Sequence, residues 1–396
     1  MRSKTKRAMT IAFAAILILS GAAILNWKPD ARVAAAPGGG GSAEPWGIGA
    51  PVTYQDLTIF PVISSQNPDT NDFETLDEAL SSGDAVISEQ GGYMRRTRDG
   101  EPVPIYTGGS QVNQLVLVNR GKRPLLLLAG EVVSGGKQDR IIGKDRIVPI
   151  GSAPLPLDVF CVEHGRWTGD SMNFSAAETM VHPTVREQAA VKQDQSQVWA
   201  AVRDETPKVG QSESVIVEGR AAGGGFAGGA AAAPPALSST AIDGVISEAP
   251  TQSYRRIYQS PMVQNSVEGF ADEMSRRFDR ATSGIKGGHV VGVVVAFGDD
   301  VAWSDIFASS QLFETYWPKL LRSYVVEALT RPAVRQAATI DDARDFLRPA
   351  TGRIREETEP GVYTWCEQSV DGLTQIELEA LWPKPITLHW LRVAVR

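Results

Sequence analysis

Residues 361–381 read GVYTWCEQSVDGLTQIELEAL, in which two runs of strand-forming residues flank Asp371-Gly372. An Asp-Gly pair between two such runs is a strong signal for the tight turn of an antiparallel hairpin. A last strand is expected over residues 386–395, so this part of the sequence predicts sheet.

The segment before this hairpin combines one strand with long helices. The run VVGVVVAF at 290–297 is typical of a strand buried on both faces. Apolar residues at helical spacing predict helices over 267–278 and 312–325, with a kink or a later start at Pro318 in the second. A further helix is expected from Pro183 to Val202, since proline fits the first turn of a helix.

Residues 51–162 predict mainly β-structure. Short apolar runs indicate a strand at 57–63 and a hairpin between 112–118 and 124–128. One short helix is expected at 73–80, with Asn71 or Asp72 as its cap. The fold class is therefore α+β: a β-rich N-terminal part and a C-terminal hairpin packed with several long helices, in one large domain with an inserted flexible loop.

Composition divides the chain into an N-terminal segment, a tether and one body. Residues 33–50 have the composition of a flexible tether, and a Gly/Ala/Pro-rich stretch at about 221–250 predicts a disordered loop. Residues 251–396 carry few predicted strands of their own with which to close a core. We therefore expect residues 51–396 to form a single α+β domain that this loop interrupts.

Residues 1–32 have the features of an export segment. A basic head, with Arg2, Lys4, Lys6 and Arg7, precedes an uncharged run at 8–25 that is about long enough to cross a ~30 Å hydrocarbon core. An uncleaved signal-anchor in the inner membrane is favoured, because charges at 28–32 separate the apolar run from a small-residue cleavage site. The alternative is a cleaved signal peptide and a periplasmic or secreted protein. Both outcomes place the body in the bacterial cell envelope, with the N-terminal segment as its membrane contact.

Composition also limits the kinds of partner and scaffold that the chain can have. The chain has 396 residues, a net charge of −7 and two cysteines. An acidic chain without a dense basic stretch is a poor partner for nucleic acid, and two cysteines exclude a disulfide-dense scaffold. In an oxidising compartment Cys161 and Cys366 could form a bridge, or they could remain separate buried thiols.

The most unusual stretch is residues 130–167, where charged side chains and glycines lie within short β segments. Glu131 and Glu163 could perform acid–base catalysis if one carboxylate is desolvated. The side chains that could hold a polar or anionic ligand are Lys137, Gln138, Arg140, Arg166 and Trp167. The alternative is that these charges form solvated turns or ion pairs on a β surface.

The sequence lacks the motifs of a phosphate-binding loop, a metal site and a cysteine nucleophile. The glycines at 130–136 lack the spacing of a phosphate-binding loop, and the four histidines lack metal-ligand spacing. Cys161 has no base at a suitable position along its probable strand. We expect neither a metal nor a cofactor.

Several segments resemble a bacterial family of uncharacterised domains named for its association with ADP-ribosylglycohydrolase and rhodanese–phosphatase domains. The central similarity is NRGKRPLLLLAGEVVSGGKQDRI at 119–141 with CVEHGRW at 161–167. It extends to YQDLTIFPV at 54–62, TLDEAL at 75–80, QSQVW at 195–199 and LHWLRV at 388–393. The resemblance implies one domain over most of residues 50–396 and, by association alone, a connection with ADP-ribose or NAD-derived metabolites. It implies no catalytic residues.

Two functions are consistent with these observations, and whether the protein is an enzyme stays open. The favoured hypothesis is a tethered envelope domain that binds a small molecule or an envelope protein. The alternative is a hydrolase-like enzyme acting on an anionic substrate, with Glu131 or Glu163 in acid–base roles and Arg140 and Arg166 as anion clamps.

Overall fold

A nine-stranded antiparallel sheet contains the predicted C-terminal hairpin. In this computed structural model the described residues are 46–89, 92–96, 102–106, 113–164, 173–204, 252–254, 261–331 and 336–395. The predicted export segment at 1–32 and the loop at 221–250 lie outside them. The strand order is β1 (Trp46–Ile48), β3 (Leu57–Ser64), β17 (His289–Phe297), β18 (Asp300–Phe307), β22 (Ile386–Ala394), β21 (Leu373–Ala380), β20 (Tyr363–Val370) and β19 (Arg353–Glu359), while β2 (Val52–Tyr54) pairs with β3.

The hairpin and the buried strand are confirmed. Val370 pairs with Leu373 across the two-residue turn, where Gly372 has a φ of +72°. The side chains of β17 from Val291 onward are buried and alternate between two apolar clusters, one on each face of the sheet. Strand β1 falls within residues 33–50, so the body begins before the end of the predicted tether.

The sheet draws most of its strands from a region where few were expected. Strands β17–β22 supply six of its nine strands, all between residues 289 and 394. The premise that residues 251–396 carry few strands was therefore wrong. Strand β19, with the sequence RIREETE, was missed because six of its seven residues are polar and give no apolar run.

Two long helices contact one another and lie next to the sheet. Helix α6 (Pro261–Thr282) and helix α7 (Ser310–Thr330) confirm the two predicted amphipathic helices. Ser309 caps α7 by accepting a hydrogen bond from the backbone N–H of Leu312 at 3.2 Å. Pro318 lies inside α7, so the helix does not begin there. Helix α8 (Ile340–Leu347) contributes to the apolar cluster on the opposite face of the sheet.

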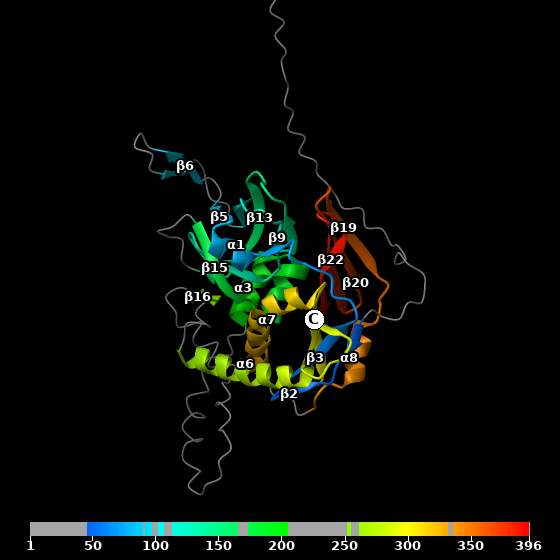
Figure 1. The fold of residues 1–396 in the computed structure, drawn as a ribbon. Coiled ribbons are helices and arrows are strands. Elements are labelled where there is room, and N and C mark those ends of the chain that lie inside the picture. The colour runs from blue at the N-terminus through cyan, green and yellow to red at the C-terminus, as the bar shows by residue number, and fades with distance from the viewer. Residues whose placement is uncertain are drawn as a thin grey trace, which may run out of the picture. The chain divides into compact units, whose positions relative to one another are not determined.

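Six further strands close into a barrel. Their order is β10 (Glu131–Gly135), β11 (Arg140–Ile142), β13 (Leu155–Cys161), β8 (Gln114–Asn119), β5 (Ala85–Glu89) and β15 (Asn173–Met180). Alternate residues such as Ile87, Leu117 and Val159 fill its interior. Val132 and Ile141 face outward and join the cluster that includes Val293 of the sheet. Barrel and sheet therefore share one hydrophobic core. Figure 1 shows the strands of both.

The hairpin predicted between 112–118 and 124–128 was wrong. Strand β8 lies in the barrel, whereas β9 (Leu125–Leu127) pairs with β12 (Arg146–Val148) and β4 (Glu74–Thr75). The Asn119 side chain donates to the carbonyls of Arg123 and Val148, at 2.9 and 3.1 Å, where the chain leaves the barrel. All of β9 is buried, which explains its continuous leucine run.

Two predicted helices differ in detail. Helix α1 (Leu76–Ser82) is capped by Thr75, whose hydroxyl accepts from the N–H of Glu78 in a capping box, and not by Asn71 or Asp72. The helix predicted over 183–202 is three pieces: α2 (Pro183–Glu187), the π-helical η1 (Gln188–Lys192) and α3 (Gln195–Asp204). Helix α2 continues directly into η1, whereas η1 and α3 are separated at Gln193, which has a φ of 52°.

Two short strand pairs complete the described elements. They are β6 (Gly92–Arg96) with β7 (Pro102–Tyr106), and β14 (Glu163–His164) with β16 (Gln252–Ser253). The expected α+β class is confirmed. Within the described ranges, no helix combines the length and the apolar character needed to cross a membrane.

Candidate functional site

The charged side chains of the polar block at 130–167 do not gather in one site, and they contact different partners. Glu131 begins β10, Arg140 begins β11, and Lys144 and Asp145 lie between β11 and β12. Glu131 and Arg140 share no hydrogen-bonding partner among the described residues. The side chain of Glu163, and Arg166 and Trp167 entirely, lie outside what the structure describes, so their roles stay predictions.

Glu131 takes part in a buried ion pair. One carboxylate oxygen accepts from Lys319 Nζ at 2.5 Å, and the other accepts from the backbone N–H of Leu128 at 2.7 Å. Lys319 also contacts Asp77 at 2.6 Å. Burial raises the pKa of Glu131, although the charge of Lys319 opposes the shift. Both oxygens are occupied and the residue is 1% exposed, which favours a role in joining β10 to α7 over acid–base catalysis.

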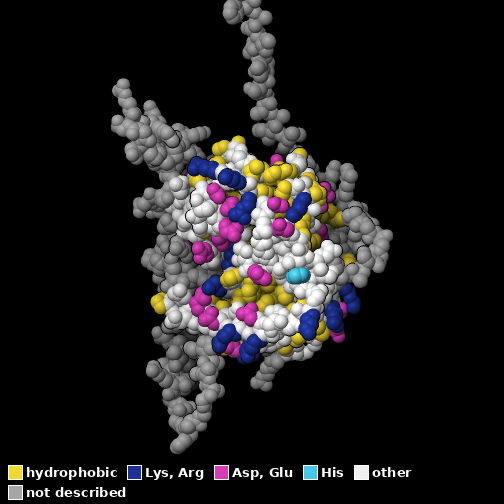
Figure 2. Space-filling model, in the orientation of Figure 1, with side chains coloured by type: hydrophobic (Ala, Val, Ile, Leu, Met, Phe, Trp, Pro, Cys, Tyr) yellow, Lys and Arg dark blue, Asp and Glu magenta, His cyan; other side chains and the backbone are white. Residues whose placement is uncertain are grey.

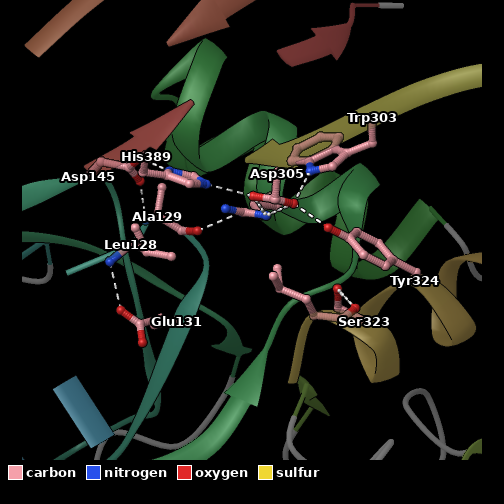
Figure 3. A network of polar contacts seen from close by, with 11 residues as sticks. Leu128, Ala129, Glu131, Asp145, Trp303, Asp305, Ser323, Tyr324 and His389 are labelled. Carbon is pink, nitrogen blue, oxygen red and sulfur yellow. Dashed lines mark hydrogen bonds and ion pairs between the residues drawn. The ribbon is translucent and has the colours of Figure 1, made fainter. Parts of the chain in front are cut away.

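Asp145 belongs to a second buried cluster, which links the barrel side of the fold to the sheet (Figure 3). Its carboxylate accepts from the N–H of Ala129 at 2.7 Å and lies 2.6 Å from Nδ1 of His389. Nε2 of His389 lies 3.0 Å from Oδ1 of Asp305. Arg186 completes the cluster, with Nη1 2.8 Å from Asp305 and Nε donating to the carbonyl of Ala129 at 2.7 Å.

Charge in this cluster is balanced. Both ring nitrogens of His389 face carboxylate oxygens, so the imidazole is doubly protonated and positively charged. Burial alone would lower the pKa of His389, but Asp145 and Asp305 raise it above its ordinary value. Burial would raise the pKa of Asp305, whereas Arg186 and His389 hold it well below its usual range.

Every carboxylate oxygen of this cluster already has a hydrogen-bonding or ion-pair partner, and the cluster is closed to solvent. Oδ2 of Asp305 accepts from Arg186 and Trp303 at 2.9 and 2.8 Å and also from the Tyr324 hydroxyl. Asp145, Arg186, Asp305 and His389 are each at most 1% exposed. We assign the cluster to holding the barrel, α2, α7 and the sheet in register.

Arg140 is different, because its guanidinium is buried and forms no ion pair with a carboxylate in the described part of the chain. It is 0% exposed, and its side chain enters the barrel on the same face of β11 as Ile142. Nη1 donates to the carbonyl of Gln138 at 2.9 Å and lies 3.3 Å from Gln138 Oε1. Nε and Nη2 have no hydrogen-bonding partner among the described residues.

Glu89 reaches the same end of the barrel. It follows Ala85 and Ile87 on the inward face of β5 and is 1% exposed. Oε1 accepts from the backbone N–H of Lys137 at 3.0 Å, while Oε2 has no partner in the described part of the chain. Glu89 and Arg140 thus bind adjacent residues of one turn, the former at Lys137 and the latter at Gln138.

Cys161 contributes a neutral group beside them. It pairs directly with Arg140 in the register of β11 and β13. Burial raises the pKa of its thiol to about 11, so it is not a thiolate nucleophile near neutral pH. No disulfide joins Cys161 and Cys366, which answers the pairing question left open by the sequence.

The turn at 136–138 brings three predicted ligand-binding residues together. Gln138 is 6% exposed and contacts Arg140, and Lys137 presents its backbone N–H to Glu89. The inward charge of Glu89 was missed, although Ala85, Ile87 and Glu89 alternate as inward positions do in a strand. Among the residues with described side chains, no group of three or more His, Cys, Asp or Glu residues is placed to hold a metal ion.

Surface charge gives no support for binding an extended polyanion on the face drawn in Figure 2. Basic and acidic side chains are interspersed there, and neither sign dominates a continuous area. A nucleic-acid site normally presents a basic patch or stripe.

Comparison with known proteins identifies the family. Residues 46–390 match the family described as ARPP-1: ARG and Rhodanese-Phosphatase-superfamily-associated Protein domain. The chain belongs to the ARPP-1 family. The resemblance seen in the sequence is thereby confirmed, and the ARPP-1 domain takes in both the barrel and the sheet. Neither the curated proteins nor the solved structures gave a match.

Proposed function

We propose that this ARPP-1 domain binds a small anionic ligand inside the end of its barrel, with Arg140 as the anchor. The observation that carries the proposal is the pair of unpartnered nitrogens, Nε and Nη2, on a guanidinium that is 0% exposed. The proposal is one of binding and does not require turnover.

The two open nitrogens are the pair that recognises planar anions. The N–H groups of Nε and Nη2 point in parallel from one edge of the guanidinium, and this edge matches the two oxygens of a carboxylate or phosphate. Nη1, on the other edge, is the nitrogen that binds the turn at Gln138. The turn therefore fixes the guanidinium while leaving its bidentate edge for a ligand.

The free-energy cost of burying the Arg140 charge favours a bound anion beside it. Burying a charged group without a partner costs several kcal/mol, even after relaxation and water penetration. Arg186 is equally buried, but it is compensated by Asp305. A bound anion would compensate Arg140 in the same way. Ordered water could satisfy the donors without supplying charge, and this is the competing outcome of the test below.

Glu89 narrows the ligand class. Its open Oε2 accepts hydrogen bonds only, so it complements a hydroxyl or amino group. A ligand that satisfies both residues carries an anionic group together with a donor, as in hydroxy acids, amino acids and phosphorylated sugars. The family resemblance implies, by association, a connection with ADP-ribose. ADP-ribose combines anionic phosphates with hydroxyl groups and so belongs to this ligand class.

We further propose that the domain works in the cell envelope. This part rests on the basic head and apolar run of residues 1–32, followed by the Gly-rich tether. An alkaline phosphatase fusion placed after residue 45 would be active if the segment exports the body, and inactive if the body stays in the cytoplasm.

Calorimetric titration and thermal unfolding of the full chain test the ligand proposal. The probes are inorganic phosphate, lactate, serine, ribose 5-phosphate and ADP-ribose, with neutral ribose as the reference. At least one anionic probe should raise the unfolding midpoint by mass action. A chain that none of them stabilises, with water alone at Arg140, would overturn the proposal.

Two matched arginine variants separate binding from structure. Arg140→Met removes a buried charge that forms no ion pair with the described residues, so the unliganded protein should unfold at an unchanged or higher temperature while anion binding is lost. Arg186→Met leaves Asp305 without its cation and should lower the unfolding midpoint. A strong loss of stability in Arg140→Met would instead assign Arg140 to the scaffold.

A further inference from the structure

A half-open cavity lies between the barrel and the edge strand β19 of the sheet. This cavity of about 290 Å³ is lined from the barrel side by Lys144, Asp158 and Phe160, from the sheet by Arg355 and Glu357, and from the helix break by Gln193. None of these residues takes part in the Arg140 site. The cavity is therefore independent of the function proposed above.

An ion-paired chain of three residues forms one wall. Lys144 Nζ contacts Glu357, which also accepts from Arg355 Nη2 at 2.7 Å. Lys144 Nζ also lies 3.7 Å from the centre of the Trp365 ring. Burial lowers the pKa of Lys144 despite its contact with Glu357. The charged groups on this wall form ion pairs with one another. Arg355 Nε is the exception, since it is buried without a hydrogen-bonding partner among the described residues.

Gln193 reaches the cavity through an unfavourable backbone conformation. It ends η1 with φ 52° and ψ 41°, the left-handed region that glycine occupies more easily. Its Oε1 lies 3.4 Å from Arg355 Nη1. Strained residues and π-helical turns both concentrate at functional sites. Here a strained residue that directly follows a π-helical turn and a largely buried lysine line one cavity.

The lining favours a neutral ligand rich in hydroxyl groups. Lys144 and Arg355 are matched by Asp158 and Glu357, so the formal charges of these four side chains cancel. A charged ligand would have to break the ion-paired chain. A hydroxyl group both donates and accepts, so it can accept from Arg355 Nε and donate to Asp158 while the ion pairs persist.

Size and apolar lining agree with that chemistry. Phe160 supplies carbon surface beside the polar groups, which suits the C–H face of a sugar ring. The volume is at the small end of ligand pockets, which span roughly 300–1,000 Å³. We propose that this cavity binds a neutral polyhydroxylated molecule the size of a monosaccharide.

Ligand-observed NMR and calorimetry on the full chain test this assignment. The probes are D-ribose, D-glucose, D-mannose and N-acetylglucosamine, compared with gluconate and glucosamine as charged analogues. At least one neutral sugar should bind at least tenfold more tightly than its charged analogue. Tighter binding of a charged analogue, or no binding of any sugar, would overturn the proposal.

Two variants place the binding in this cavity. Asp158 is exposed, and no ion pair or side-chain hydrogen bond is recorded for its carboxylate in the described part of the chain, so Asp158→Ala should fold normally. Gln193→Gly relieves the left-handed strain while removing the amide. Both should weaken sugar binding at least tenfold, with an unchanged or higher unfolding midpoint in Gln193→Gly.

The matched control is Glu178→Gly. Glu178 is exposed, has the same φ of 52° and lies in β15 rather than in the cavity lining. It should share any gain in unfolding midpoint but keep full sugar affinity. Equal affinity in Gln193→Gly and Glu178→Gly would show that the sugar binds elsewhere and would overturn the proposal.

Discussion

His389 and Asp305 lie on the neighbouring strands β22 and β18, and Nε2 of the histidine is 3.0 Å from Oδ1 of the aspartate. Nδ1 of the same ring faces Asp145 at 2.6 Å, outside the sheet. The imidazolium therefore connects two carboxylates from parts of the chain that are far apart in sequence. Since these groups are fully buried, their charges depend on one another.

Asp305→Asn should strongly destabilise the protein. The substitution preserves shape but removes the negative charge that compensates Arg186 and His389. Breaking a buried ion pair on one side costs about 3–5 kcal/mol. Urea unfolding at pH 7 measures the change. The matched control Asp341→Asn affects an exposed pair with Arg344 and should stay within about 0.5 kcal/mol of the parent. Equal stability of the two variants would contradict the role assigned to the cluster.

The charge on His389 should make stability depend on pH. Its pKa in the folded state is raised above 6.5, because Asp145 and Asp305 outweigh the effect of burial. A raised folded pKa gives stability that is complete below about pH 6.5 and declines as the pH rises through the folded value.

The free energy of unfolding, measured in urea from pH 6 to 9, should therefore fall with pH more steeply in the parent than in His389→Gln. The variant should also be less stable at pH 6, by about 3–5 kcal/mol, because it leaves both aspartates short of a cation. His289→Gln is the control, since His289 is exposed and should leave the pH profile unchanged. Identical slopes in all three proteins would refute a charged His389.

Local sequence signals were sufficient for the elements that neighbouring residues define. Asp371-Gly372 placed the hairpin, and the run at 290–297 placed the buried strand, because turn chemistry and burial act within a few residues. The barrel could not be predicted in this way. Its closing pairs join β5 to β15 and β10 to β15, which are separated by long stretches of chain.

The candidate sites show the same limit. Arg140 and Gln138 are close in sequence, and their charge and polarity within a glycine-rich stretch marked them as unusual. Asp145, Arg186, Asp305 and His389 are brought together only by the tertiary fold. No spacing rule links them, so the sequence could not indicate that His389 is an internal cation.

Gly130 is a position where a methyl group should be poorly tolerated. Its φ is +93°, and a Cβ there would lie 2.8 Å from Cγ of Arg186. Gly130→Ala should cost about 2–4 kcal/mol through backbone strain and displacement of the arginine. Gly83→Ala is the matched control, because Gly83 also has a positive φ, of +82°, but nothing lies within 4 Å of the added atom. It should cost only about 1–2 kcal/mol. Equal losses in urea unfolding would show that the contact with Arg186 is unimportant.

The two thiols should resist alkylation in the folded protein. Burial raises the pKa of Cys161 and of Cys366 to about 11, so few thiolates exist at pH 8. Iodoacetamide should label the native chain slowly, and Cys161 more slowly than Cys366, because Cys161 is buried while Cys366 is half-buried. In urea without reductant, both should react within minutes, and mass spectrometry should show two added groups. If the cysteines were bridged, iodoacetamide would add two groups only after a reducing step, so a requirement for reductant would contradict the absence of a disulfide. Rapid labelling of Cys161 in the native protein would instead show that the barrel end opens, and it would bring Arg140 within reach of solvent.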